Sequence, residues 1–162
     1  MRMSKLVRFS SDILFPFVVI FGLYVIMHGH LTPGGGFQGG AVVATGVALV
    51  IVAYKYEEVI GWISKKTLTA QEVVGLCGFI GTALVAFFFA APFFYNYLAG
   101  AGGLFGIPVA YGPNPGELNT GGFVPLMNIS VGIEVWGGLA IVMLYMLSGL
   151  LKKEEQNNEE ES

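Results

Sequence analysis

Four long apolar stretches constrain this chain more than any other feature. They cover roughly residues 11–27, 37–54, 73–91 and 126–151. A bilayer core about 30 Å thick is crossed by about 20 residues of helix, with about 17 to 25 tolerated. Only 12% of the residues are charged, against about 25% in a soluble domain, so few residues are suited to face water. The sequence predicts an all-α integral membrane protein with four transmembrane helices.

The basic residues predict the orientation of these helices, because Lys and Arg near helix ends are retained on the cytoplasmic side. All eight fall before the first helix, between the second and third, or after the fourth: Arg2, Lys5, Arg8, Lys55, Lys65, Lys66, Lys152 and Lys153. No small-residue cleavage site follows the first stretch, so we expect a retained helix rather than a signal peptide. We expect both termini in the cytoplasm, a membrane domain over residues 1–151 and an acidic cytoplasmic tail over 152–162.

The connections between the helices differ in composition. The cytoplasmic connection over 55–72 mixes charged with apolar residues, as a segment along the headgroups would. Thr69 and Glu72 have the spacing of a capping box and predict that the third helix begins there. Aromatic residues 93–97 resemble an interfacial belt. The outer connection over 99–125 is rich in Gly and Pro and poor in charge, which favours a compact loop over a poorly ordered one.

Small residues recur at helical spacing on the second and third helices, which predicts close helix packing. The two ridges are Gly36, Gly40, Ala44 and Ala48, and Gly75, Gly78, Thr82 and Ala86. Four short helices enclose little space by themselves. We therefore expect other membrane subunits as partners.

Glu134 is an ionisable residue deep inside the fourth apolar stretch. It lies about 12 Å from the outer end of that stretch, at 1.5 Å per residue. A carboxylate at this depth costs about 2.5 kcal/mol or more unless it is neutral, paired or hydrated. Helical spacing places small and polar residues on the same face: Ser130, Gly138, Ile141, Tyr145 and Ser148. Two hypotheses follow, a structural carboxyl group that joins two helices and a role in moving protons or cations.

The remaining chemistry-bearing residues point to no catalytic site. His28 and His30 lack the spacing of a metal site on one helical face, although imidazoles that titrate near neutral pH leave a proton-transfer role open. Cys77 is expected to be a small buried apolar residue. The spacing of Gly34, Gly36 and Gly39 matches a dinucleotide-binding turn, but this segment joins two membrane helices and follows no strand. We predict no enzyme activity of the chain by itself, no cofactor, no metal and no nucleic-acid partner.

Two segments resemble a known family. The run FGLYVIMHGHLTPGGGFQGGAVVATG (21–46) and the run GELNTGGFVPLMNISVGIEVWGG (116–138) are similar to the MnhB/MrpB-type subunit of multisubunit Na⁺/H⁺ antiporters. The resemblance covers roughly residues 9–151. The residues that match its two motifs are His28, His30, Pro33, Gly34, Gly35, Gly36 and Gln38, and Asn119, Gly121, Asn128, Gly132 and Glu134.

The resemblance implies an accessory subunit in the cell membrane of a prokaryote. Its partners would include antiporter-like, proton-pumping subunits, and its complex would transport Na⁺ and H⁺. In such a complex this subunit would help form or stabilise the cation path, and our own hypothesis is that Glu134, His28 and His30 belong to that path or its coupling. Similar subunits occur in membrane-bound hydrogenases and sulfur-reducing complexes, so an ion-translocating or scaffolding module of a respiratory complex is the alternative.

Overall fold

The described part of the chain folds into five helices. The computed structural model describes residues 3–54, 56–89, 91–108 and 117–160. Within these residues there is no named strand, and the helices are α1 (Lys5–Met27), α2 (Gly36–Ala53), α3 (Tyr56–Trp62), α4 (Lys65–Phe88) and α5 (Val124–Glu160). The four long helices are each long and apolar enough to cross a membrane. The predicted all-α fold with four membrane helices is therefore confirmed, whereas the side on which the termini lie stays a prediction.

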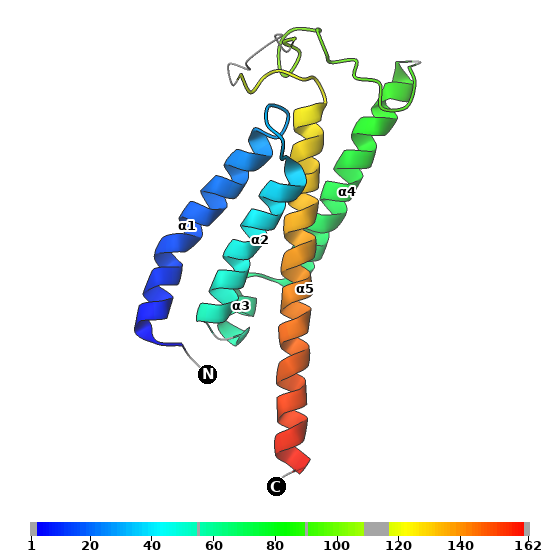
Figure 1. Ribbon diagram of the computed structural model, residues 1–162. Coiled ribbons are helices and arrows are strands. Elements are labelled where there is room, and N and C mark those ends of the chain that lie inside the picture. Colours follow the sequence, from blue (N-terminus) through cyan, green and yellow to red (C-terminus); the bar gives the residue numbers. More distant parts are fainter. Residues whose placement is uncertain (1–2, 55, 90, 109–116, 161–162) are drawn as a thin grey trace.

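The long helices lie side by side in the order α1, α2, α5, α4 (Figure 1). α2 packs between α1 and α5, and α5 packs between α2 and α4. The start of α1 and the end of α5 lie at the same end of the assembly, which we call the termini end. This arrangement is an open row rather than a closed bundle. Large apolar side chains such as Phe17 of α1 and Phe88 of α4 are therefore exposed, ready to contact lipid or other subunits.

Glycines bring the helix backbones into direct contact. A Cβ on Gly22 of α1 would lie 2.9 Å from the carbonyl oxygen of Gly39 in α2, and one on Gly40 would lie 2.7 Å from the carbonyl oxygen of Gly132 in α5. A Cβ on Gly75 of α4 would lie 2.5 Å from the Glu134 backbone nitrogen in α5. Both predicted small-residue ridges thus pack against α5 of the same chain. The two ridges therefore do not support a contact with a partner subunit. That expectation rests instead on the open row of helices.

The start of α4 corrects the sequence prediction. The helix begins at Lys65 with Ser64 at the N-cap position, so Glu72 lies two turns inside it. Thr69 Oγ1 donates a hydrogen bond to the Lys65 carbonyl oxygen at 3.1 Å, as a residue within a helix does. The predicted capping box is therefore wrong. Of the predicted interfacial connection, only the short helix α3 and its flanking residues lie between α2 and α4.

A cluster of buried residues at the termini end holds α2, α3, α4 and α5 together. Its members are Val47, Val50, Val59, Leu68, Ala140, Ile141 and Leu144. Val59 of α3 is fully buried there. The short helix is therefore packed onto the other helices through Val59, while Trp62 at its end lies against the Tyr54 ring and remains 61% exposed.

The other helix ends also differ from the apolar stretches. α1 begins at Lys5, where the Ser4 hydroxyl accepts a hydrogen bond from the Val7 amide. α5 continues through Glu160, so the described part of the predicted acidic tail, residues 152–160, has a helical backbone (Figure 1). α2 matches its predicted range to within one residue at each end.

The described parts of the long outer connection bond to one another. Asn96 joins both sides, because its amide nitrogen donates to the Gly121 carbonyl and its amide oxygen accepts from the Phe123 amide, both at 3.0 Å. Ile107 and Thr120 form an isolated bridge. These contacts hold residues 117–123 over the outer ends of the helices.

Candidate functional site

The two sequence motifs meet at the end of the row opposite the termini end, which we call the outer end after the predicted orientation. Asn128 of α5 lies against the turn between α1 and α2, where a Cβ on Gly29 would lie 2.7 Å from its Nδ2 atom and one on Gly35 would lie 2.7 Å from its Oδ1 atom. One turn further along α5, Gly132 lies against Ile26 of α1 and Gly36 of α2. Because these positions leave no room for a side chain, the motif glycines serve close packing of three helices. We call this region the outer junction.

The glycine-rich turn is fixed by its own hydrogen bonds. Gln38 Oε1 accepts a hydrogen bond from the Gly35 amide at 2.9 Å at the start of α2. Gly34 has a φ of 136°, a conformation that L side chains rarely adopt. Pro33 precedes it and restricts the chain at the turn. The dinucleotide-like glycine spacing therefore has a local explanation, and it contributes to the outer junction.

The two histidines occupy different environments. The His28 ring lies against Tyr24, with 3.9 Å between ring centroids, and its Nδ1 atom is 3.1 Å from the Tyr24 carbonyl oxygen. The His30 ring lies against Gly121 of the outer connection. Neither ring nitrogen of His30 has a hydrogen bond of good geometry within the described residues. His30 thus anchors the segment around Gly121 to the turn between α1 and α2.

Burial lowers the pKa of His30, an effect partly offset by the nearby backbone carbonyl of Glu117. The folded chain thus binds this proton less readily than the unfolded chain, whose imidazole pKa is about 6.5. The contribution of this contact to the free energy of unfolding should be full above that pH and should decrease as the pH falls below it. We expect the thermal midpoint of the purified chain to decrease between about pH 7 and about pH 5, and to decrease less in His30→Phe.

The control for this measurement is Phe21→Leu, which changes an exposed α1 residue that does not titrate, because His28 itself contributes to the lowered pKa of His30. This variant should keep the pH dependence of the unmodified chain. If the thermal midpoint depends equally on pH in His30→Phe and in the unmodified chain, His30 is not the source of this dependence.

Glu134 lies on the seam between α5 and α4, away from the outer junction. It is half-buried, and no hydrogen bond or ion pair of its carboxylate is found among the described residues. A Cβ on Gly75 would contact the backbone of Ser130 and Glu134, at 2.6 Å and 2.5 Å, and one on Gly78 would lie 2.8 Å from the Ser130 hydroxyl. The polar face predicted for this helix is therefore the face that packs on α4.

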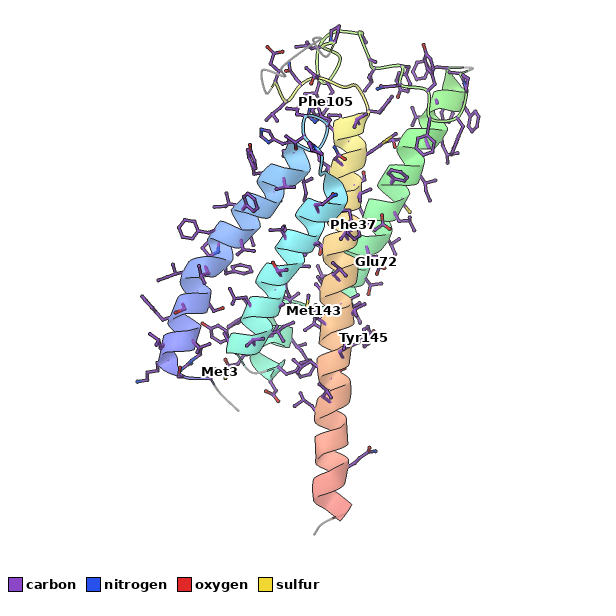
Figure 2. All side chains as sticks on the ribbon, viewed as in Figure 1. Met3, Phe37, Glu72, Phe105, Met143 and Tyr145 are labelled. Carbon is purple, nitrogen blue, oxygen red and sulfur yellow. The ribbon has the colours of Figure 1, made fainter. Side chains whose placement is uncertain are left out.

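Glu72 of α4 is a second carboxylate on the same seam (Figure 2). Its Oε1 atom would lie 3.4 Å from a Cβ on Gly138, which is one helical turn from Glu134 on α5. Both acids thus lie within about one turn of each other along α5. Carboxylates at membrane depth normally face a bundle interior or an ion path, because an unpaired charge there is costly.

The sequence pattern predicted none of the contacts of several polar residues, and Cys77 of α4 is exposed rather than buried as predicted. Glu72 was assigned to a helix cap because of its spacing from Thr69. The Tyr54 hydroxyl donates a 2.5 Å hydrogen bond to Asp12, which joins the end of α2 to α1 although the two residues are distant in sequence. Asn96 is an isolated polar residue in a loop. Periodicity could have placed Asp12 and Glu72 on helices, but not their partners.

No group of three or more metal-ligating His, Cys, Asp or Glu side chains gathers in the described parts of the chain. Glu134, His28 and His30 are not brought together. Glu134 lies six residues beyond Asn128, about 9 Å from the outer junction along α5.

Comparison with known proteins identifies a family and several proteins that this chain resembles. A family described as "Domain related to MnhB subunit of Na+/H+ antiporter" matches residues 6–141. An uncharacterized protein of Methanocaldococcus jannaschii is 29% identical over 137 residues, which is 85% of this chain and 50% of that protein. A putative antiporter subunit mnhB2 of Staphylococcus aureus is 34% identical over 80 residues, which is 49% of this chain and 56% of the relative.

A solved structure shares the fold. It is a chain of the membrane-bound sulfane sulfur reductase, an archaeal respiratory membrane complex, with 30% sequence identity and a TM-score of 0.70. The match covers 91% of this chain and 59% of the other. The chain therefore spans about half to three fifths of the length of the relatives that it matches.

Proposed function

Because the chain belongs to the family of domains related to the MnhB subunit of Na⁺/H⁺ antiporters, we propose that it is an accessory membrane subunit of a multisubunit cation/proton antiporter. The family match over residues 6–141 carries this proposal. The open row of helices supports it, since exposed apolar faces can contact neighbouring subunits in a membrane. The complex would lie in the cell membrane of a prokaryote, and its transported ions would be Na⁺ and H⁺.

A second candidate function rests on the structural match. The relative with a TM-score of 0.70 is part of a respiratory membrane complex. The chain would then be an ion-translocating or scaffolding module of an oxidoreductase complex, with other subunits performing the redox chemistry. The subunits that co-purify with the chain distinguish the two functions, because only the second requires redox subunits.

The proposed accessory role predicts that the chain does not transport ions by itself. Reconstituted alone in proteoliposomes, it should give no cation-dependent proton flux, because a single open row of helices encloses no path across the membrane. The native complex, purified through a tag on this chain, should give such flux. A pH-sensitive dye inside the vesicles measures both. Robust antiport by the isolated chain would refute the accessory role.

The orientation of the helices is a proposal that a labelling experiment tests. In a background with Cys77→Ala, single cysteines are placed at Ser64 and Glu117, which are both exposed and lie at opposite ends of the helices. An impermeant thiol reagent added to intact cells should label the cysteine at position 117 and leave the one at position 64 unlabelled until the cells are opened. Labelling with the reverse pattern would place the termini outside.

We further propose that the α4–α5 seam takes part in the ion path or in its electrostatic control. Glu134 and Glu72 carry this part of the proposal through their depth and proximity. His28 and His30 lie at the end of the same row opposite the termini, and we propose that they belong to this path or its coupling.

A further inference from the structure

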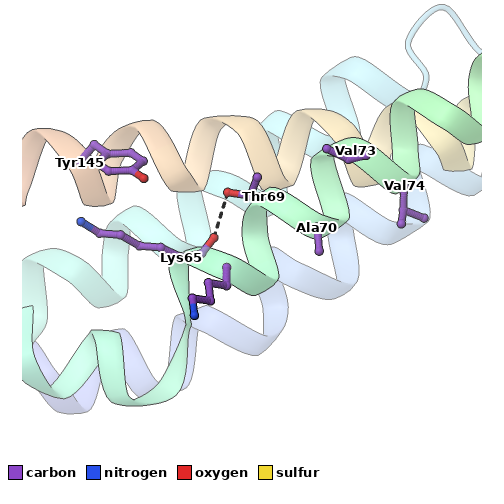
Figure 3. Close-up of a pocket in the computed structure, with 7 residues that line it drawn as sticks. Lys65, Thr69, Ala70, Val73, Val74 and Tyr145 are labelled. Atoms are coloured by element: carbon purple, nitrogen blue, oxygen red, sulfur yellow. Dashed lines mark hydrogen bonds between the residues drawn. The ribbon is translucent and has the colours of Figure 1, made fainter.

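A groove of about 520 Å³ opens on the flank of α4 at the termini end. The first three turns of α4 form most of it, and Tyr145 of α5 closes one side (Figure 3). Lys65, Lys66 and Thr69 provide its polar lining, and Ala70, Val73 and Val74 provide its apolar lining. The groove lies outside the outer junction and beside the seam that holds the two carboxylates.

The polar end of the groove is basic. Lys65 Nζ lies 4.3 Å from the ring centroid of Tyr145 and donates a hydrogen bond to the Ser148 hydroxyl at 3.2 Å. Lys66 is exposed. Neither ammonium group forms an ion pair with a carboxylate of the described residues. Two positive charges therefore lie at this end of the groove.

The depth of the groove matches the boundary of the membrane. Lys65 lies opposite Ser148, near the end of the apolar part of α5 at Leu151. From this level, α4 continues toward the membrane interior with Ala70, Val73 and Val74, and the two valines are 52% and 63% exposed. The groove is thus basic at headgroup level and apolar where acyl chains lie.

We propose that this groove binds an anionic membrane lipid. Its phosphate would lie against Lys65 and Lys66, and one acyl chain would follow Ala70, Val73 and Val74 along α4. Basic pockets between membrane helices on the cytoplasmic side are suited to anionic headgroups, and each Lys near the surface contributes about 1 kcal/mol. Charge complementarity favours a lipid over an apolar helix of another subunit, which would leave the two ammonium groups without partners.

Native mass spectrometry of the purified full chain tests the proposal with phosphatidylglycerol and phosphatidylcholine as probes. We expect phosphatidylglycerol adducts to persist at lipid concentrations at which phosphatidylcholine adducts are lost. Lys66→Gln should weaken phosphatidylglycerol binding about fivefold, as expected for the loss of one Lys. The matched control is Lys5→Gln, which removes the same charge from the termini end but lies on α1, and it should leave binding unchanged.

A second variant tests the apolar half of the groove. Ala70→Trp fills the groove without changing charge, and it should also lower phosphatidylglycerol binding. Equal binding of both lipids, or equal effects of Lys66→Gln and Lys5→Gln, would overturn the proposal. In the native complex, a photo-crosslinking residue at position 70 should capture lipid. Capture of a protein subunit there would show that a partner helix fills the groove, and would also overturn it.

Discussion

Gly75→Leu is expected to prevent stable folding of the chain. A Cβ at this position would lie 2.5 Å from the Glu134 backbone nitrogen and 2.6 Å from the Ser130 carbonyl oxygen. These neighbours are backbone atoms, so α4 must move away from α5 as a whole. We expect the free energy of unfolding to decrease by more than about 3 kcal/mol, which is the upper end of typical overpacking costs. The yield of monodisperse protein in size-exclusion chromatography and the thermal midpoint measure the effect.

Gly81→Leu is the matched control on the same helix. No atom lies within 4 Å of a Cβ built at Gly81, so the added side chain meets open space. It should leave yield and thermal midpoint nearly unchanged, although it adds the same apolar side chain to α4. Equal losses in both variants would mean that the sequence of α4 tolerates no Leu for a reason other than its contact with α5.

The sequence predicted the membrane helices well because the bilayer imposes their length. The helix ends were harder to predict, since an apolar stretch ends where charged residues begin, whereas a helix continues as long as its backbone hydrogen bonds do. Lys65 and Lys66 therefore belong to α4, and the acidic residues beyond Leu151 belong to α5. The wrong prediction of a capping box at Thr69 and Glu72 has the same cause. Because α4 already begins at Lys65, the amides near Glu72 are bonded within the helix and need no cap.

The individual residues of the candidate site could be predicted from the sequence, but the contacts between them could not. The family motifs singled out Gly35, Gly36 and Asn128, and depth singled out Glu134. Nothing in one sequence shows that Asn128 lies between the glycines of the first motif, because that contact depends on the side-by-side order of α1, α2 and α5. The same limit hid Glu72, whose neighbour Gly138 lies far away in sequence.

Transport by the native complex should decrease strongly in Glu134→Gln. The substitution keeps the shape of the side chain and removes its titratable charge, so the packing of α5 on Gly75 should survive. Two unit charges about 4 Å apart interact by about 4 kcal/mol at an effective dielectric constant of about 20. If an ion in the path loses about 1.4 kcal/mol of this interaction, the transport rate decreases about tenfold. Cation-dependent proton flux in proteoliposomes measures it.

Two further substitutions separate an ion-path role from a structural one. Glu117→Gln removes a carboxylate from the exposed outer connection and should leave transport unchanged. Glu72→Gln removes the second carboxylate of the α4–α5 seam, and it should also lower transport if the seam contributes to the ion path. Full assembly of the Glu134→Gln complex with unmodified transport across the working pH range would show that this carboxyl group only joins helices. Full assembly with reduced transport would place the carboxylate in the path or in its electrostatic control, because packing alone does not depend on a titratable charge.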